Sequence, residues 1–450
     1  MPVEWSRPEG SGKVKSRYWN LGASLISFVL LTSCTADAPL INKANGSAYC
    51  AIPTRWSTVD KSYPPEVRLK EKTIEHIEQF WSDFKRDQTT ITLAFENLSS
   101  ESGKANAEIL LNWMKEHLEV IDPVIKYEFV QVRGTETKRI DFSASGHDEV
   151  VPICKSLVAK APKIKNWQFS SSMQPLLPAA IAGEFKRRKG RDPIQFEASV
   201  SISPQNKLDV IFTSPEFGND EADNVEACRA LSEFSVGEEN DDLWLGTITP
   251  KNGSLMGQFN CANNAQQYAK AFNEKKKELL ASLPGTPYFK QDLSKTEEVN
   301  FTGKKRLSMK TALKKLAETL GAGGRFHDVQ FSKNGERFAY LKVPNAKDLQ
   351  SIDQVEALGK ELDAELRKAQ AGCVFGVGIE SPDIIYLDIA LADLEKATPV
   401  LKSFSESHKF AHDSALRFYD CVWRNEWVGM FDDAKKPQDL KNPWYLVQAN

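Results

Sequence analysis

The chain has 450 residues, which predicts two or three domains, because a single domain usually holds about 100–150 residues. Hydrophobic residues make up 41% and charged residues 26% of the chain, so the composition excludes a disordered or fibrous protein. The formal net charge is −3, and it becomes −5 without the basic residues 1–33. This balance argues against nucleic acid as a partner.

The first predicted feature is an apolar run from Leu21 to Leu31 that follows a basic segment. As a helix, the run would measure about 16 Å, roughly half the thickness of a bilayer core, so it is too short to span a membrane. A basic segment, an apolar run and then small residues form the layout of a secretory signal peptide. We expect residues 1–33 to be this peptide.

The run ends in Leu31-Thr32-Ser33-Cys34, which resembles the lipobox of bacterial lipoprotein precursors. The resemblance implies cleavage between Ser33 and Cys34, a diacylglycerol on the Cys34 sulfur and an acylated new N-terminus. Because Thr35 rather than Asp follows, it also implies the periplasmic face of the outer membrane in a bacterium with two membranes. Secretion without lipidation, an uncleaved anchor and a misassigned start codon in a cytoplasmic protein stay as alternatives.

After the lipobox, residues 34–70 contain few large apolar residues, which predicts a flexible tether with a reach of about 30 Å. An N-terminal α+β domain is expected over 71–285, a helical connector over 286–325 and a C-terminal ferredoxin-like α+β domain over 326–450. The fold class is therefore α+β, with ferredoxin-like (split βαβ) units and mixed or antiparallel sheets.

Within 71–285, alternating periodicities predict the elements. In chain order they are a helix from Glu71 to about Phe84, a strand from Thr89 (TTITLAFENL), a helix around Leu110–Leu118, the hairpin IKYEFVQV and RIDFSAS, a helix over 148–160 and the strand NWQFSSS. Residues 194–250 repeat part of this order, with IQFEASVSIS, KLDVIFTS, a helix around Val225–Phe234 and LWLGTIT.

The C-terminal domain begins with VQFSKNGERFAYLKV, where Asn334-Gly335 predicts a tight hairpin. In a plain ferredoxin-like sheet that hairpin would compete for the neighbour of the first strand. The elements that follow are a helix over 346–369, CVFGVGI, DIIYLDI, a helix over 391–405 and ALRFYDCVW.

Residues 71–250 also resemble a family of uncharacterised bacterial proteins, through a helix that ends in Ala161-Pro162, the strand residues Trp167 and Phe169, and Gly237-Glu238. The resemblance implies an α+β fold and supplies no activity.

Motif searches give few candidate sites. The sequence has no G-x-S-x-G elbow, phosphate-binding loop, H-E-x-x-H or EF-hand loop, which removes the best-marked hydrolase, nucleotide and metalloprotease options but not enzymes with dispersed sites. His408 and His412 have the i, i+4 spacing of a weak metal candidate, but we expect no metal and no cofactor. The cysteines other than Cys34 are even in number and permit disulfides, although Cys154 lies on an apolar stripe that predicts a buried thiol.

Charged clusters are the remaining candidates. The run Lys186, Arg187, Arg188, Lys189 and Arg191 is a possible contact with anionic lipid or an acidic partner, although a solvated loop is favoured. The acidic stretches GNDEADNVEA and GEENDD are expected to be solvated surface. Ser145 to Asp148 are expected to form a turn and helix cap rather than part of a hydrolytic site.

Together these features predict a lipid-anchored cell-envelope protein that acts as a non-catalytic binding or assembly module, with the membrane and an envelope protein as partners. The alternative is an envelope hydrolase with a dispersed acidic and histidine site. A pocket in which acidic or histidine side chains converge would bear on this choice.

Overall fold

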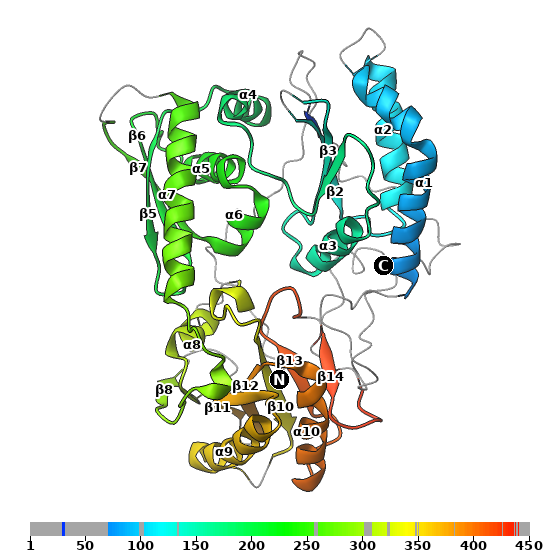
Figure 1. Ribbon diagram of the computed structural model, residues 1–450. Coiled ribbons are helices and arrows are strands. Elements are labelled where there is room, and N and C mark those ends of the chain that lie inside the picture. Colours follow the sequence, from blue (N-terminus) through cyan, green and yellow to red (C-terminus); the bar gives the residue numbers. More distant parts are fainter. Residues whose placement is uncertain are drawn as a thin grey trace, which may run out of the picture.

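The computed structural model describes residues 29–31, 71–98, 103–132, 135–255, 260–300, 308–321, 325–346, 349, 351–381, 383–424, 426–435, 437 and 440. The fold is α+β, as predicted, with helices packed on three mixed or antiparallel sheets. Three units have hydrophobic cores of their own: the N-terminal unit (71–170), the middle unit (178–282) and the C-terminal unit (288–430). Figure 1 shows the N-terminal and middle units side by side, with the C-terminal unit below them.

The N-terminal unit packs a helical hairpin against a small sheet. Its elements are α1 (Glu71–Glu96), α2 (Gly103–Leu118), β2 (Lys126–Gln131), β3 (Lys138–Ser143), the 3-10 turn η4 (Asp148–Val150), α3 (Val151–Ala159) and β4 (Trp167–Ser170). The sheet order is β1-β2-β3-β4, with β1 at Val29–Leu31; β2 and β3 are antiparallel, whereas β3 and β4 are parallel.

Helix α1 corrects one prediction, because the segment from Thr89 is helical and not a strand. Ile91 and Phe95 continue the buried stripe that Ile77 and Phe84 begin, and Leu93 between them is 53% exposed. This is helical periodicity over the whole 26 residues, so burial of one face outweighs the local preference of Thr-Thr-Ile-Thr for strands. The first strand of the predicted split βαβ order is therefore missing.

The middle unit repeats the strand order of the first, an antiparallel pair followed by a parallel strand. Its elements are α4 (Pro178–Lys189), β5 (Glu197–Ile202), β6 (Leu208–Ser214), α5 (Glu221–Val236), α6 (Glu238–Trp244), β7 (Leu245–Asn252) and α7 (Cys261–Ser282). The Asp220 side chain accepts from the Asp223 N–H at 3.1 Å and caps α5. The predicted domain over 71–285 thus contains two separate cores.

The C-terminal unit is built on a seven-stranded sheet of order β14-β13-β10-β12-β11-β9-β8. Its elements are η5 (Tyr288–Lys290), β8 (Glu297–Asn300), β9 (Ser308–Thr311), α8 (Lys314–Gly321), η6 (Asp328–Gln330), β10 (Arg337–Pro344), α9 (Ile352–Lys368), β11 (Gly372–Ser381), β12 (Ile384–Leu391), α10 (Leu394–Ser407), β13 (Ala415–Phe418) and β14 (Trp427–Gly429). None of the described helices is long and apolar enough to cross a membrane.

Two predictions for this unit are wrong. The hairpin at Asn334-Gly335 does not form: the 3-10 turn η6 precedes the bend, and only β10 follows it. This leaves both sides of β10 to β12 and β13, so the competition for a neighbour disappears. The connector 286–325 is not simply helical, because it supplies β8 and β9 to one end of the sheet. Since these strands and β14 enlarge the sheet, the ferredoxin-like description stays a prediction.

Candidate functional site

The three units meet around a cavity of about 200 Å³, which we call the junction pocket. Each unit contributes charged or titratable side chains to its wall. They are Asp148 and Lys155 from the N-terminal unit, Glu238, Glu239 and Asp242 from the middle unit, and His327, Arg337 and Asp420 from the C-terminal unit. Pockets at the meeting of separate structural units are common places for ligands.

Glu238 reaches this place because of the residue before it. Gly237 has φ +82° and separates α5 from α6, and a Cβ atom there would lie 2.8 Å from the Pro175 ring. The Glu238 carboxylate then accepts the Met173 N–H at 2.9 Å and the Ser143 hydroxyl of the N-terminal unit. It therefore joins two units as well as lining the pocket.

The Glu238 carboxylate has no basic partner among the described residues. Burial raises its pKa to about 7, and the charges of Asp242 and Glu233 act in the same direction, whereas its two hydrogen bonds act against them. Glu238 thus titrates near neutral pH. The prediction of a solvated surface for GEENDD is wrong here, since Glu238 and Asp241 are half-buried and burial also raises the Asp241 pKa to about 7.

Arg325 links all three units at the edge of the pocket. Its guanidinium donates to Asp148 of the N-terminal unit and, at 2.9 Å, to Asp242 of the middle unit. Asp148 is 4% exposed, so this ion pair offsets the cost of burying its carboxylate. Ser145 and Gly146 do form the predicted turn, but the Asp148 carboxylate binds Arg325 and no side-chain cap is formed at His147.

His327 is the unusual member of the site. The imidazole is 2% exposed and faces the Gln330 N–H in the capping box of η6, but neither ring nitrogen makes a hydrogen bond of ordinary geometry with a described residue. The nearest charge is Asp420, whose Oδ1 lies 3.5 Å from Nδ1. Asp420 itself accepts the backbone N–H groups of Asp328 and Val422, each at 2.8 Å. A buried polar group without a partner is rare in folded proteins and calls for an explanation in function.

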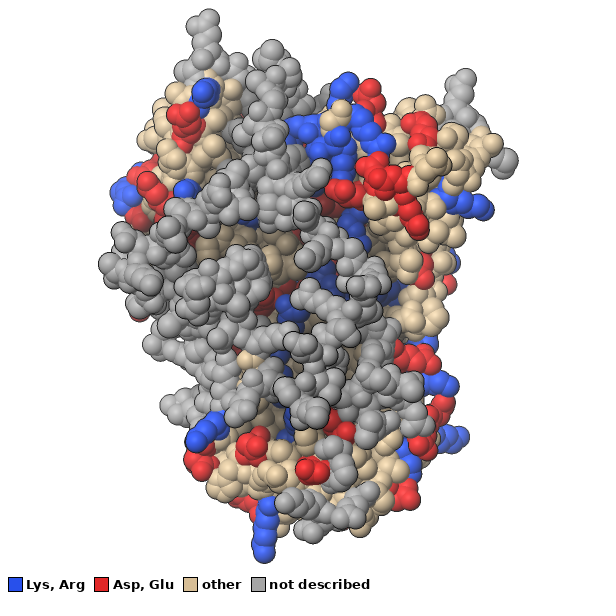
Figure 2. All heavy atoms as spheres, turned by 180° about the vertical axis from the view of Figure 1, so that it is seen from behind, with Lys and Arg blue, Asp and Glu red and all other residues tan. Residues whose placement is uncertain are grey.

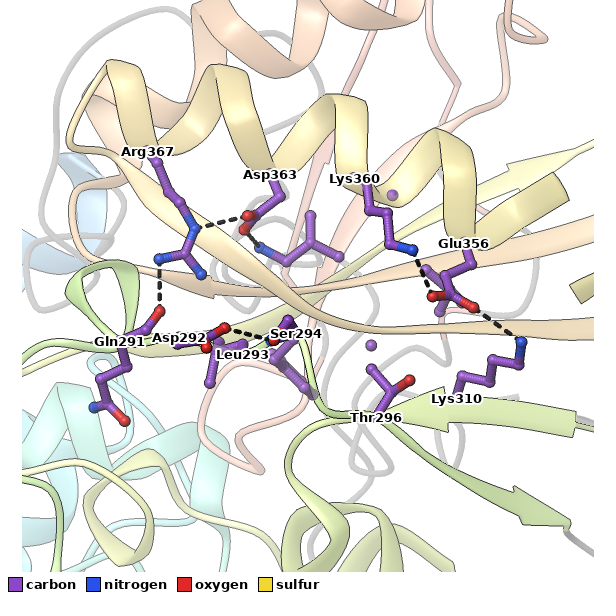
Figure 3. Close-up of a pocket in the computed structure, with 15 residues that line it drawn as sticks. Gln291, Asp292, Leu293, Ser294, Thr296, Lys310, Glu356, Lys360, Asp363 and Arg367 are labelled. Carbon is purple, nitrogen blue, oxygen red and sulfur yellow. Dashed lines mark hydrogen bonds and ion pairs between the residues drawn. The ribbon is translucent and has the colours of Figure 1, made fainter. Parts of the chain in front are cut away.

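A second and larger cavity of about 420 Å³, the α9 groove, lies between α9, β11 and residues 291–296. Figure 3 shows that its charged side chains contact one another. Glu356 lies 2.8 Å from Lys360 and 2.9 Å from Lys310, and Arg367 lies 2.7 Å from Asp363. The lysines and the arginine of the groove are therefore paired within it, whereas the exposed Asp292 carboxylate accepts the Ser294 N–H at 2.9 Å.

The basic run lies in the last turn of α4 and just after it, and not in a loop. Each of its members faces a carboxylate: Lys186 with Asp192, Arg187 with Glu184, Arg188 with Glu184 and Glu233, Lys189 with Glu226, and Arg191 with Asp223. In Figure 2 basic and acidic side chains lie directly against each other at the top of the molecule. A membrane or partner contact here stays a prediction, and it would have to compete with these ion pairs.

His408 and His412 do not share a helix face, because α10 ends at Ser407. His408 lies 3.2 Å from Glu361, whereas His412 lies 2.8 Å from Asp433. Within the described part of the chain, no three His, Cys, Asp or Glu side chains meet in a way that would hold a metal ion.

Five of the cysteines, Cys154, Cys228, Cys261, Cys373 and Cys421, are free thiols, and Cys154 is fully buried as predicted. Cys34, its cleavage site at Ser33, the tether over 34–70 and Cys50 lie outside the described residues. Lipidation therefore stays a prediction.

Comparisons of the chain with protein-family models, with curated proteins and with solved structures found no match. The resemblance over 71–250 therefore also stays a prediction, and the function has to be argued from the site.

Proposed function

We propose that this protein is a non-catalytic binding module of the cell envelope, anchored through lipidated Cys34, and that the junction pocket is its ligand site. The observation that carries the proposal is His327, a buried imidazole without a hydrogen-bond partner in the wall of a cavity that three units build together. Such a group has a stabilising partner only when a ligand or water fills the pocket.

Binding is favoured over covalent catalysis because the pocket lacks a paired nucleophile. Ser171 and Ser172 line it, but His327 is hydrogen bonded to neither hydroxyl. A serine nucleophile needs a base within hydrogen-bond reach.

One observation favours the alternative, a hydrolase that uses an acidic and histidine site. Glu238 has a pKa near 7 and shares the pocket with His327, and groups that titrate near neutral pH suit general acid–base chemistry. Hydrolysis of an ester or glycoside panel by the wild type, lost in Glu238→Gln, would establish this alternative. Turnover that persists in Glu238→Gln would remove Glu238 from it.

The pocket is tested by ligand-observed NMR with a mixture of small cationic, anionic and neutral fragments. Val329 lines the pocket and is 44% exposed, so Val329→Trp places an indole at its mouth without disturbing a core. Val120→Trp, at a residue that is 41% exposed on the N-terminal unit, is the matched control. We expect fragments to bind the wild type and the control but not Val329→Trp, and equal binding to all three would refute the pocket.

The anchor is tested separately by labelling cells with palmitate. We expect label on the wild type and none on Cys34→Ala, which should leave the membrane fraction. An unlabelled wild type would refute the anchor and leave the proposal for the pocket standing.

A further inference from the structure

We propose that the ligand of the junction pocket is a small organic amine, bound as its ammonium ion, with an apolar body. This inference rests on the proposed binding function and adds the chemical class of the ligand. Three features of the pocket support an ammonium ligand: its unpaired carboxylates, its open hydrogen-bond acceptors and the apolar surface beside them.

The pocket is short of positive charge. Of its lining carboxylates, Asp148 and Asp242 share Arg325, and Glu239 lies 3.3 Å from Lys155. Among the described residues, Glu238 contacts only uncharged donors, and Asp420 contacts two backbone N–H groups and the His327 imidazole. The remaining lining cation, Arg337, pairs with Asp328 and lies over the Trp423 ring. A bound cation would supply the missing charge.

Apart from the hydroxyls of Ser171 and Ser172, which can donate or accept, the open hydrogen-bonding groups are acceptors. If the Nδ1 atom of His327 carries the proton and faces Asp420, Nε2 presents a lone pair. The carboxylates of Glu238 and Asp420 have further lone pairs, since each oxygen can accept more than one hydrogen bond. A ligand therefore has to bring donors, and an ammonium group brings three of them together with a positive charge.

The cation is organic because the wall is partly apolar. Val151, Pro152, Val329, Val422 and Trp423 line the same cavity, and hydrocarbon buried against them would be removed from water, which favours binding. A metal ion would leave this surface in contact with water. At about 200 Å³ the pocket is smaller than a site for a drug-sized molecule, so the amine is small.

Benzylamine is the probe, and benzyl alcohol and benzoate are its neutral and anionic counterparts. Their affinities for the full chain are measured by calorimetry or NMR titration at pH 8. We expect benzylamine to bind at least tenfold more tightly than either counterpart. Glu238→Gln should weaken benzylamine by about tenfold and benzyl alcohol by much less, because the substitution removes charge and keeps the shape.

The pH dependence gives a second readout. Glu238, which faces Ser143, the Met173 N–H, Asp242 and Glu233, has to be ionised to attract an ammonium ion. Benzylamine affinity should therefore rise between pH 6 and pH 8, and it should rise more steeply in the wild type than in Glu238→Gln, which keeps the other titratable groups of the pocket. A flat wild-type profile would contradict the inference.

Two results distinguish a failure of the amine hypothesis from a failure of the ligand pocket. Binding of benzyl alcohol or benzoate as tight as that of benzylamine, lost in Val329→Trp, would overturn the amine and keep the ligand pocket. Failure of all three probes and of the fragment mixture to bind the wild type would overturn both.

Discussion

The α9 groove and the junction pocket are lined by the same kinds of side chains, yet they differ in how these are paired. In the groove, which is the larger cavity, Lys310, Lys360 and Arg367 each lie against a carboxylate of the same wall. In the junction pocket, no described residue gives Glu238 a basic partner or the His327 ring a hydrogen bond. The better candidate site is therefore indicated by unpaired charged and hydrogen-bonding groups rather than by cavity size.

The largest expected effect comes from breaking the ion pairs of Arg325. Arg325→Met should lower the free energy of unfolding by about 2–3 kcal/mol, because it leaves Asp148 buried and unpaired; partial exposure of Arg325 keeps the loss below that of a fully buried pair. Urea denaturation at pH 7 measures it. A loss below about 0.5 kcal/mol would mean that the link between the units stabilises no more than a surface ion pair.

Next in size is a pH effect at Glu238. Its pKa rises from 4.5 to about 7 on folding, so the folded state holds the proton more tightly, and stability should be lost as pH rises through this window. Relative to Glu238→Gln, the wild type should lose on the order of 2 kcal/mol between pH 4.5 and pH 7, as urea denaturation at several pH values would show.

Glu356 in the α9 groove is a control in which the pKa shifts in the opposite direction from that of Glu238. Its hydrogen bond with Lys360 lowers its pKa below 4.5, so its contribution is present above that pH and is lost as pH falls. The wild type should therefore gain stability over Glu356→Gln as pH rises from the acidic range. Slopes of the same sign at both sites would contradict the contrast between the two cavities.

A smaller change is expected at His327. Because neither ring nitrogen is hydrogen bonded, His327→Leu should raise the free energy of unfolding by about 1 kcal/mol, as measured by urea denaturation. His117→Leu is the contrasting control and should be destabilising, since His117 stacks on Trp113 and contacts its carbonyl at 2.7 Å. A loss of stability in His327→Leu would mean that the contact with Asp420 is a stabilising hydrogen bond.

The smallest effect belongs to the groove. Lys310→Met should change the free energy of unfolding by less than about 1 kcal/mol, because one partner, Asp353, is 81% exposed and the pair is screened by solvent. Thermal denaturation at low and high salt measures it. A loss as large as that of Arg325→Met would remove the distinction between the groove and the junction.

The sequence predicts much of the fold where local patterns agree with burial. The strand pair β2 and β3 and the strands β11 and β12 lie close to the ranges that the sequence predicts. Two local sequence patterns predict the wrong structure. The stretch from Thr89 favours a strand by local preference, but it is part of α1 because Ile91 and Phe95 face a core. Asn334-Gly335 forms a bend after the turn η6 instead of a hairpin.

The site was far less predictable than the fold. About ninety positions separate Asp148 from Glu238, and about ninety more separate Glu238 from His327. Only the packing of three units brings them to one cavity. The acidic stretch GEENDD was visible in the sequence, but nothing local distinguishes half-buried Glu238 from exposed Glu239. The orphan imidazole of His327 has no sequence signal at all, since a missing partner is a property of the packed structure.

The turn η6 has a mechanical consequence. The buried Gln330 side chain donates to the Leu243 carbonyl of the middle unit, and the backbone carbonyl of Gln330 accepts from the Asn206 side chain of the same unit at 2.9 Å. This turn also follows His327 directly. The hydrogen bonds between the two units and the wall of the pocket therefore lie on the same short segment of backbone. A shift in the angle between these units would therefore reshape the pocket, and a molecule held there would bias that angle, which makes the junction a point of conformational coupling.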